Sequence, residues 1–256
     1  MPTPETVPRK EDSFPYYHRD TLFARNLLAQ QDLGVTQQPI YSLNGHATLC
    51  AYELLVRRPG STARGILRGC RDAAIFPALA GALVFKAHEL SQRTGKPCHI
   101  NVLVEDLTPR FADLVEELSP AESNGQVVIE VFEGDPLTKE SIDVLSRLHD
   151  RGYRTLLDDV LTRYRPLKLI QDGLPISGVK LGHHVTHRSI RSRGYRPSHA
   201  ALARLEKLAD TCAQQGLAMV AEGANRRGDR KQLRKLGMPG DLLFYQRNRE
   251  RGFDPL

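Results

Sequence analysis

"TLLDDVL", residues 155 to 161, is an apolar run that contains two adjacent aspartates, Asp158 and Asp159. Its length and apolar content are typical of a buried β-strand. Successive side chains of a strand point to opposite faces of the sheet. One of two consecutive carboxylates would therefore enter a buried face unless the strand ends at this point. We expect the strand to end on the pair and to bring its charges to a rim of the sheet.

Apolar runs of strand length alternate with amphipathic, helix-like segments along most of the chain. The strand candidates are residues 36–43, 47–57, 98–104, 126–133, 153–160, 177–183, 217–223 and 241–246. The helix candidates are residues 76–95, 106–118, 138–152, 199–216 and 229–237. Short apolar strands that alternate with helices predict an α/β fold, with a parallel sheet covered on both faces.

The first two strand candidates are separated by little more than "NGH" at 44–46, which predicts a hairpin and so an antiparallel start. The 256 residues of the chain could form two small domains. Eight strands nevertheless fit a closed barrel, which typically needs about 250 residues, better than an open sheet. We predict a flexible polar tail at residues 1–20 and a single barrel domain at residues 21–256.

The composition is that of a globular protein, with 40% hydrophobic and 26% charged residues. No stretch approaches the about 20 continuous apolar residues of a membrane span, and the first residues lack the apolar centre of a signal peptide. We therefore expect a cytoplasmic protein without a membrane partner. The net charge of +6 weakly favours an anionic ligand and does not by itself indicate a nucleic-acid polymer. The four separated cysteines form no CxxC pair and are expected to be reduced thiols.

Polar side chains recur inside or just after successive strand candidates. They are Glu53, Asn101, Glu130 with Glu133, Asp158 with Asp159, Lys180 and Glu222. In closed α/β barrels the chemistry lies at the carboxyl ends of the strands. We therefore expect these side chains to gather at one rim of the barrel.

Several carboxylates at one rim repel one another, by roughly 4 kcal/mol for a pair about 4 Å apart at an effective dielectric near 20. They cannot all stay ionised unless a cation lies between them or some take up protons. A cluster of carboxylates and one amide suits Mg²⁺ or Mn²⁺, which predicts metal-assisted hydrolysis of a phosphodiester, with Lys180 holding the water or stabilising negative charge. The alternative is that each acidic residue only caps a helix or lies in a solvated loop.

Six motifs in order resemble those of the EAL domain, the bacterial cyclic di-GMP phosphodiesterase family, across nearly all of residues 30–250. They are "QPIYSLNGHATLCAYELLVR" (38–57), "INVL" (100–103), "IEVFE" (129–133), "LLDDVLTRY" (156–164), "VKLG" (179–182) and "GLAMVAEGAN" (216–225). Glu53-Leu54-Leu55 stands in place of the eponymous Glu-Ala-Leu. The resemblance implies a modified TIM-type barrel with an antiparallel first strand, and hydrolysis of cyclic di-GMP to linear pGpG.

The resemblance also implies a role for each matching residue. Lys180 matches the lysine beside the nucleophilic water and Glu222 a glutamate needed at the metal centre. The first metal ion would be held by Glu53, Asn101, Glu130 and Asp158, and the second partly by Asp159. Gln38 and Arg57 match residues that contact the dinucleotide, and Glu133 matches the anchor of the loop after the aspartate pair.

The sequence departs from the family pattern at several of these motifs. Gly182 replaces the aspartate of the Lys-Ile-Asp motif, Asn225 replaces a second glutamate, and Gly240-Asp241 stands for a Gln-Gly pair. The loop Val160-Leu161-Thr162-Arg163 lacks both glycines of the family's Phe-Gly-Thr-Gly. In the family this loop supports metal binding and dimer contacts, so its path here should differ.

Two functions follow from these observations. The first is a cyclic di-GMP phosphodiesterase dependent on Mg²⁺ or Mn²⁺, of reduced activity if the altered loop limits turnover. The second is a non-catalytic module that binds cyclic di-GMP as a receptor, or acts on a regulatory protein partner. The resemblance suggests a homodimer and a role in bacterial motility or biofilm control.

Two further motifs follow Lys180. His183, His184 and His187 could form a zinc site or be surface histidines. The arginine-rich run at 187–196 could be a solvated loop, or a patch that attracts an anionic ligand or an acidic partner.

Overall fold

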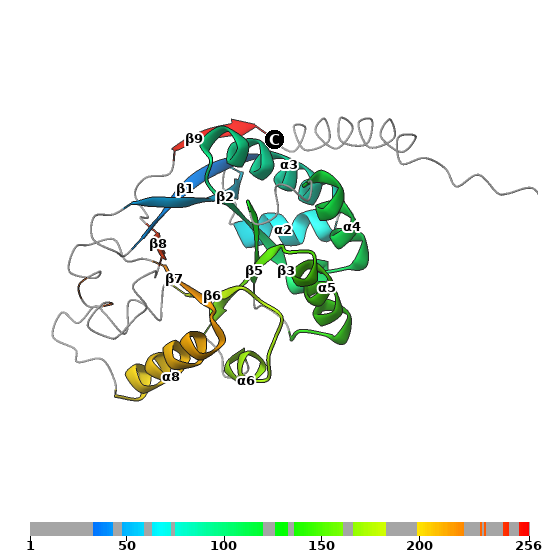
Figure 1. Cartoon of the computed structure of the whole chain (residues 1–256). Helices are drawn as coiled ribbons and strands as arrows, with labels where there is room; N and C mark the ends of the chain where they lie inside the picture. Colours follow the sequence, from blue (N-terminus) through cyan, green and yellow to red (C-terminus); the bar gives the residue numbers. More distant parts are fainter. Residues whose placement is uncertain are drawn as a thin grey trace, which may run out of the picture.

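A sheet of nine strands forms the framework of the protein (Figure 1). The computed structural model describes residues 33–42, 48–58, 63–72, 75–119, 126–132, 136–160, 166–182, 199–222, 231, 233, 243–245 and 251–255. The strands are β1 Gly34–Ser42, β2 Leu49–Arg57, β3 Cys98–Leu103, β4 Val127–Phe132, β5 Arg154–Val160, β6 Gly178–Leu181, β7 Ala218–Ala221, β8 Leu243–Tyr245 and β9 Arg251–Pro255. The α-helices are α2 Ala63–Asp72, α3 Phe76–Thr94, α4 Pro109–Leu118, α5 Lys139–Asp150, α6 Pro166–Gln171 and α8 His199–Gln215, and a 3₁₀ turn, η2, covers Val104–Asp106.

The sheet closes on itself. Strands β2 to β8 pair in sequence order, each parallel to the next. Strand β1 pairs antiparallel with β2 on one side and with β8 on the other, which completes a ring of eight strands. The pairing confirms the predicted modified TIM-type barrel with an antiparallel first strand. All eight predicted strands are present, although the hairpin turn at 44–46 lies outside the described residues.

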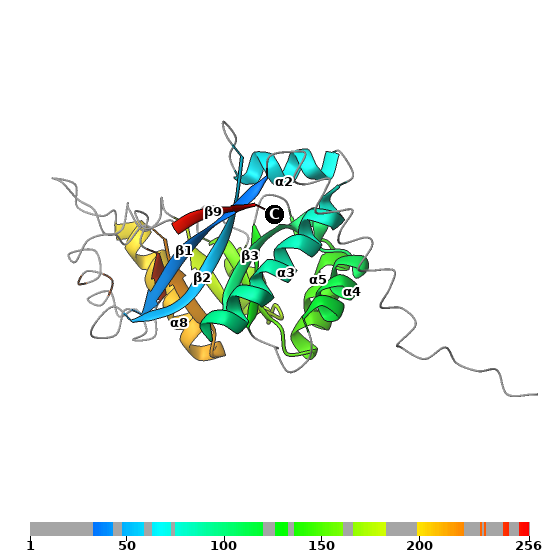
Figure 2. The same ribbon diagram turned by 90° about the horizontal axis from the view of Figure 1, so that it is seen from above.

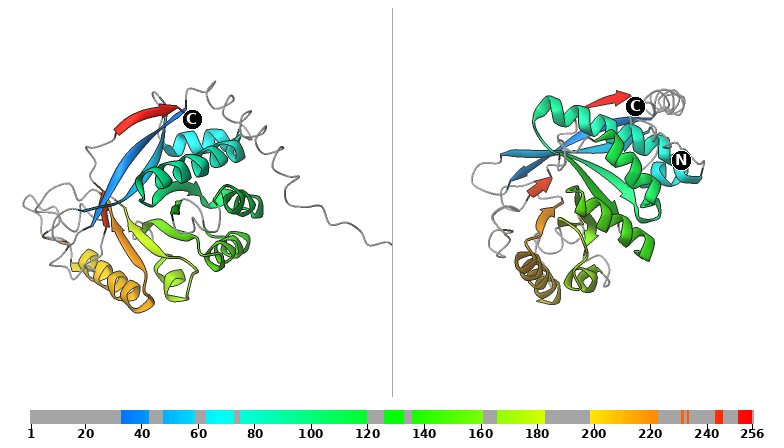
Figure 3. Two further views of the ribbon diagram at one scale, coloured as in Figure 1. Left: turned by 45° about the horizontal axis from the view of Figure 1, so that its top comes forward. Right: turned by 45° about the vertical axis from the view of Figure 1, so that its right-hand side comes forward.

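Strand β9 was not predicted. It pairs antiparallel with the first part of β1, from Gly34 to Gln37, while β8 pairs with the last part, from Ile40 to Ser42. Figure 3 shows β9 lying along β1 in both of its views.

Apolar side chains fill both faces of the barrel wall. On the outer face, a large cluster packs the strands against the helices, and Leu54, Ile100, Ile129, Leu157 and Val179 are its strand members at the centre of the wall. On the inner face, a smaller layer closes the barrel interior and consists of Ile40, Ala51, Val128, Leu156 and Val220. Burial on both faces explains the nearly continuous apolar runs in the sequence.

Local sequence signals set where several helices begin and end. Helix α3 has Pro77 near its start and ends at Gly95, whose φ of 62° is a conformation that glycine adopts without strain. Thr108 caps α4 by accepting a hydrogen bond from the N–H of Phe111. Thr138 and Ser141 form a reciprocal capping box at the start of α5.

Two described helices were not predicted, α2 and α6, and of the predicted helix at 229–237 only residues 231 and 233 are described. Helix α2 lies next to β2 and α3, at the end of the barrel where β2 finishes (Figure 2). No helix in the described part of the chain is both long and apolar enough to cross a membrane. The N-terminal tail predicted at 1–20 lies outside the described residues.

Candidate active site

Polar side chains occupy the inner face of the barrel next to its apolar layer. The residues along one face of a strand are two positions apart, so Glu53 follows Ala51, Glu130 follows Val128 and Asp158 follows Leu156. The same spacing places Glu222 after Val220 and Lys180 after Gly178. The sequence thus changes from apolar to ionisable at the same depth on five strands, and the predicted site residues of these strands lie together.

Lys180 stands at the centre of this group. Its Nζ lies 2.7 Å from Glu130 Oε2, 3.0 Å from Glu222 Oε1, 3.2 Å from Glu53 Oε1 and 3.4 Å from Asp158 Oδ2. The Lys180 side chain is only 1% exposed. A buried ammonium group is costly unless it is paired, and here four carboxyl groups surround it.

Asn101 extends the group toward β3. Its Nδ2 donates a hydrogen bond to Glu53 Oε1 at 2.7 Å, which leaves the amide oxygen of Asn101 as a further oxygen donor at the site. Six of the eight residues predicted to gather at one rim therefore do so: Glu53, Asn101, Glu130, Asp158, Lys180 and Glu222.

A β-bulge explains the two adjacent aspartates of β5. Leu157 pairs with Val179 and Val160 with Leu181, so β5 has one residue more than β6 over this interval. Because of the extra residue, both Leu157 and Val160 join the outer core. Asp158 points inward to Lys180, and Asp159 takes up the irregularity with a φ of 57°. The strand does not end on the pair but continues for one residue to Val160, where the strand candidate 153–160 also ends.

Glu130 is held through both of its oxygens. Oε2 accepts a hydrogen bond from Lys180, and Oε1 lies 2.7 Å from Nδ1 of His99. His99 was not among the predicted site residues. The signal was present, because His99 lies two residues before Asn101 on the same face of β3 and is in register with Glu53.

Burial and charge shift the pKa values of three carboxyl groups. Burial raises the pKa of Glu53 well above its ordinary value, and the repulsion from Glu130 adds to this effect. Burial likewise raises the pKa of Asp158 to about 8, although Lys180 opposes the shift. Burial would also raise the pKa of Glu130, but Lys180 and His99 together hold it below its ordinary value. Glu130 is therefore the ionised partner of Lys180, while Glu53 and Asp158 favour their protonated forms.

The donor set fits a hard divalent cation. Mg²⁺ and Mn²⁺ favour carboxylate and amide oxygens, and the carboxyl oxygens here already surround one cation, the Lys180 ammonium. In the described part of the chain, no three His, Cys, Asp or Glu side chains form a ready metal-binding group. A metal ion would therefore have to enter a cluster whose centre is occupied by the ammonium group of Lys180.

Two predicted substrate-binding residues belong to the same face as Glu53. Gln38 of β1 lies directly opposite Glu53 in the β1–β2 pairing. Arg57 is four residues beyond Glu53, about 13 Å along the strand toward its carboxyl end, and is partly exposed. Arg58 follows it and is exposed. These positions place cationic groups above the carboxylate cluster at the barrel mouth.

Several predicted features cannot be located. Glu133, Asn225 and Gly240-Asp241 lie outside the described residues, as do Leu161 to Arg165 of the loop after the aspartate pair. The same holds for His183, His184, His187 and the arginine-rich run. Gly182 is described, and it directly follows β6.

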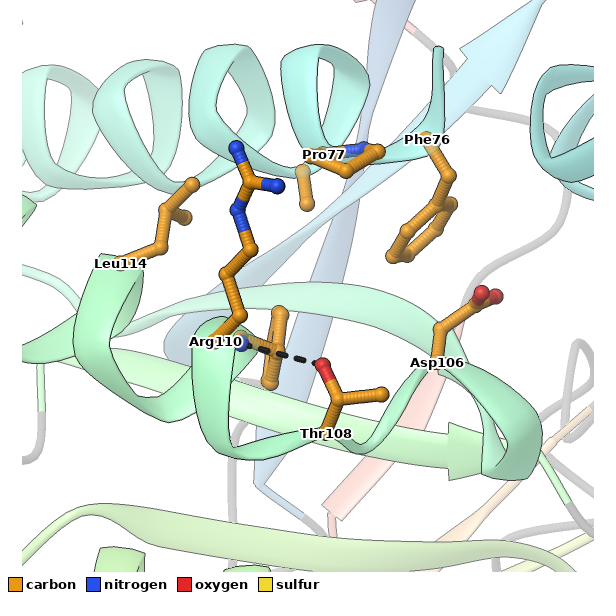
Figure 4. Close-up of a pocket in the computed structure, with 8 residues that line it drawn as sticks. Phe76, Pro77, Asp106, Thr108, Arg110 and Leu114 are labelled. Atoms are coloured by element: carbon orange, nitrogen blue, oxygen red, sulfur yellow. Dashed lines mark hydrogen bonds between the residues drawn. The ribbon is translucent and has the colours of Figure 1, made fainter. Parts of the chain in front are cut away.

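A separate pocket of about 320 Å³ lies outside the barrel, between the starts of α3 and α4 (Figure 4). Phe76, Pro77 and Leu114 give it an apolar wall, and Asp106 and Arg110 lie on its other sides. This pocket contains none of the predicted site residues, so it is distinct from the carboxylate cluster.

Comparisons with known proteins agree with this architecture. The model of the EAL domain family matches residues 23–240. The PaMucR phosphodiesterase in complex with c-di-GMP is 18% identical, with a TM-score of 0.71 over 86% of this chain and 96% of that one. An EAL domain protein from Listeria monocytogenes EGD-e is also 18% identical, with a TM-score of 0.70 over 90% of this chain and 92% of that one.

A longer protein, BlrP1 from Klebsiella pneumoniae in a manganese and cyclic di-GMP complex, is 22% identical, with a TM-score of 0.67 over 86% of this chain and 56% of that one. At these identities the likeness to solved structures shows the fold. No functionally curated protein sequence gives a significant match.

Proposed function

Since the chain belongs to the EAL domain family, we propose that it is a metal-dependent phosphodiesterase that hydrolyses cyclic di-GMP to linear pGpG. The observation that carries the proposal is the convergence of Glu53, Glu130, Asp158 and Glu222 on Lys180 inside the barrel. Such a cluster is costly to bury as a structural element alone, because like charges must be kept close together in a low dielectric.

The proposed cofactor is Mg²⁺ or Mn²⁺. Glu53, Asn101, Glu130 and Asp158 would hold the first ion, and Asp159 would contribute to a second. Such ions, when bound, polarise a phosphoryl oxygen and lower the pKa of a bound water. The manganese and calcium complexes of BlrP1 with cyclic di-GMP support this choice of cofactor and ligand.

Lys180 is the proposed positioning group for the attacking water. Its ammonium group is a donor of three hydrogen bonds and accepts none, so it can orient a water through the oxygen and stabilise negative charge that develops on the phosphoryl group. Glu222, less buried than the other three acids at 29% exposure, lies toward the mouth and can accept a proton or a hydrogen bond from the same water.

Arginines at the mouth suit an anionic dinucleotide. Arg57 and Arg58 end β2, and Arg68 is exposed on α2, the helix at this end of the barrel. A guanidinium group binds phosphate through two parallel hydrogen bonds. With Gln38 opposite Glu53, these residues would position the substrate above the carboxylates.

The test is incubation of the purified protein with cyclic di-GMP and Mn²⁺, with pGpG measured by chromatography. The Glu53→Ala variant is the control, because it removes a proposed metal ligand. We expect pGpG to accumulate with the wild type alone. Equal amounts of pGpG from both proteins would reject the proposed function.

A second candidate function is a receptor for cyclic di-GMP without catalysis, or a regulator that binds a protein partner. It is favoured by Gly182, which follows β6 where the family has a carboxylate, and by a loop after β5 without the family's glycines. Calorimetry with cyclic di-GMP in Ca²⁺ measures binding apart from turnover. Binding without pGpG formation in Mn²⁺ would support the receptor, and no binding of nucleotide or metal would leave only the protein-binding form.

The loop itself can be tested by replacing Val160-Leu161-Thr162-Arg163 with Phe-Gly-Thr-Gly. A sharp rise in turnover would show that the native loop limits catalysis, and unchanged turnover would show that it does not. The homodimer, the cytoplasmic location and the role in motility or biofilm control stay predictions.

A further inference from the structure

His99 forms the base of the carboxylate cluster. It is 3% exposed and lies on the inner face of β3, in register with Glu53 on one side and Val128 on the other. Its Nδ1 is 2.7 Å from Glu130 Oε1. It therefore contacts the cluster from the apolar side of the barrel, opposite the mouth through which a substrate would enter.

The hydrogen bond between His99 and Glu130 has a defined direction. Oε2 of Glu130 lies 2.7 Å from the ammonium group of Lys180, and a carboxylate paired with an ammonium group only accepts hydrogen bonds. Nδ1 of His99 must therefore carry a proton and donate it to Oε1. Since Oε2 accepts from Lys180 at 2.7 Å, the carboxylate is fixed at both oxygens and cannot rotate freely.

We propose that His99 is a positioning residue for the cation site, which orients Glu130 so that Oε2 alone faces the cation. This inference rests on the proposed function, in which Glu130 is a metal ligand. With Oε1 engaged by His99, Glu130 would bind an ion through one oxygen and leave other positions around it for water and substrate. In metal sites, partners that hold a ligand in this way commonly change metal affinity by about 10- to 100-fold when they are removed.

The packing of the barrel does not itself require an imidazole at position 99. Val128, its inner neighbour on β4, belongs to the apolar layer of the barrel interior, and an apolar side chain at position 99 would extend that layer. A buried polar pair is often replaceable by apolar groups with little change in stability. A histidine aimed at Glu130 is therefore better explained by the orientation of the carboxylate than by the fold.

The test compares two variants of similar size, His99→Gln and His99→Met. Glutamine has an N–H that can donate to Glu130, whereas methionine has no donor. Calorimetric titration of the full chain with Mn²⁺ alone should show affinity reduced tenfold or more in His99→Met and largely retained in His99→Gln. Val128→Ala is the matched control, because it disturbs the packing beside His99 and removes no hydrogen bond. Its Mn²⁺ affinity should stay within about twofold of the wild type.

Folded His99→Met with wild-type Mn²⁺ affinity would overturn the inference, as would a wild-type protein that binds no Mn²⁺. If His99→Met does not fold, ¹⁵N NMR of the imidazoles in the metal-free wild type decides, with the His99 signal assigned from its loss in His99→Gln. A proton on Nδ1 is expected, and a bare Nδ1 would overturn the inference. Because Mn²⁺ is titrated without nucleotide, a lack of pGpG formation would reject the proposed function without affecting this readout.

Discussion

Lys180 and its four carboxyl neighbours show how a buried cluster of ionisable residues distributes its charge. One ammonium group cannot neutralise four ionised acids, and each remaining negative charge in the buried cluster is costly. The raised pKa values of Glu53 and Asp158 and the lowered pKa of Glu130 have the same explanation. One acid pairs with the ammonium, and the two most buried of the others favour protons.

The pKa of Asp158 predicts how stability depends on pH. Its pKa is raised from 3.8 to about 8 in the folded protein, mainly by burial. Between these values the folded state binds a proton that the unfolded state has lost, so stability falls as pH rises through this window. We expect the Tm measured by circular dichroism in a chelating buffer to fall as pH is raised from about 5 to about 9.

Asp158→Asn is the control for this pH dependence, because the amide cannot ionise. Its Tm should change less over the same range, with the remaining slope due in part to Glu53, whose pKa is shifted in the same direction. Glu130, whose pKa is lowered in the folded protein, makes stability depend on pH only below its ordinary pKa of 4.5. A wild-type Tm that rises across the window would contradict the prediction.

At this scale the sequence predicted the six residues of the cluster but not their contacts. Strand alternation and the position of each polar residue in an apolar run were enough to place them on one rim. The bulge was not predictable, because it depends on pairing between β5 and β6 and on the φ of 57° at Asp159. His99 was overlooked because it precedes the rim and stands in the apolar part of its strand.

Strands β6 and β7 approach each other closely at Gly178, the first residue of β6. A Cβ on Gly178 would lie 2.5 Å from the carbonyl oxygen of Ala218 and 2.9 Å from Leu156 Cδ2. Only glycine fits between these strands without a shift of the backbone. This close approach lets β6 bring Lys180, two residues later, into the centre of the interior.

Gly178→Ala should therefore destabilise the protein by about 1–3 kcal/mol, the usual cost of inserting a methyl group into a packed core. Gly69→Ala on α2 is the matched control, since a Cβ there has no neighbour within 4 Å and alanine should raise the stability of a helix by about 0.5–1 kcal/mol. Urea denaturation measures both. Equal effects of the two substitutions would refute this account of Gly178.

Thr155 in β5 offers a second test at the level of the strand. Its Oγ1 is buried and has no hydrogen-bond partner, and it lies on the same face as Leu157 in the outer core. Thr155→Val removes a desolvated hydroxyl and keeps the shape, so the free energy of unfolding should rise by up to about 1 kcal/mol. Thr211→Val is the control, because Thr211 Oγ1 donates to Lys207 O at 2.9 Å and its removal should not stabilise the protein. Stabilisation of both variants in urea denaturation would contradict the argument.

The elements that sequence patterns failed to predict contain glycine or proline. Helix α2 contains two glycines in ten residues, and α6 has six residues that begin at Pro166. Strand β9, "RGFDP", contains both glycine and proline, which are depleted in strands. It is defined by its pairing with β1 rather than by its own composition. Elements such as α5 were predicted correctly because their burial repeats at a regular interval.

Metal binding should stabilise the whole molecule, because the proposed ligands come from β2, β3, β4 and β5. An ion that binds only the folded state adds about 2.7 kcal/mol at a concentration of 100 times its Kd. We expect saturating Mn²⁺ to raise the Tm by several degrees in differential scanning calorimetry. Glu53→Gln should reduce this shift strongly, and an equal shift in both proteins would argue against a site in the barrel.

Strand β1 joins residues that are far apart in the sequence, since Gly34 to Ser42 pair with Leu243 to Tyr245 and with Arg251 to Pro255. During synthesis, the wall can grow strand by strand from β2 to β7, but its seam stays open until β8 has left the ribosome. Pairing over such a sequence separation is slow. The nascent chain therefore has to keep β1 on β2 alone, with its other edge exposed to chaperones and to neighbouring chains, while β3 to β7 are synthesised.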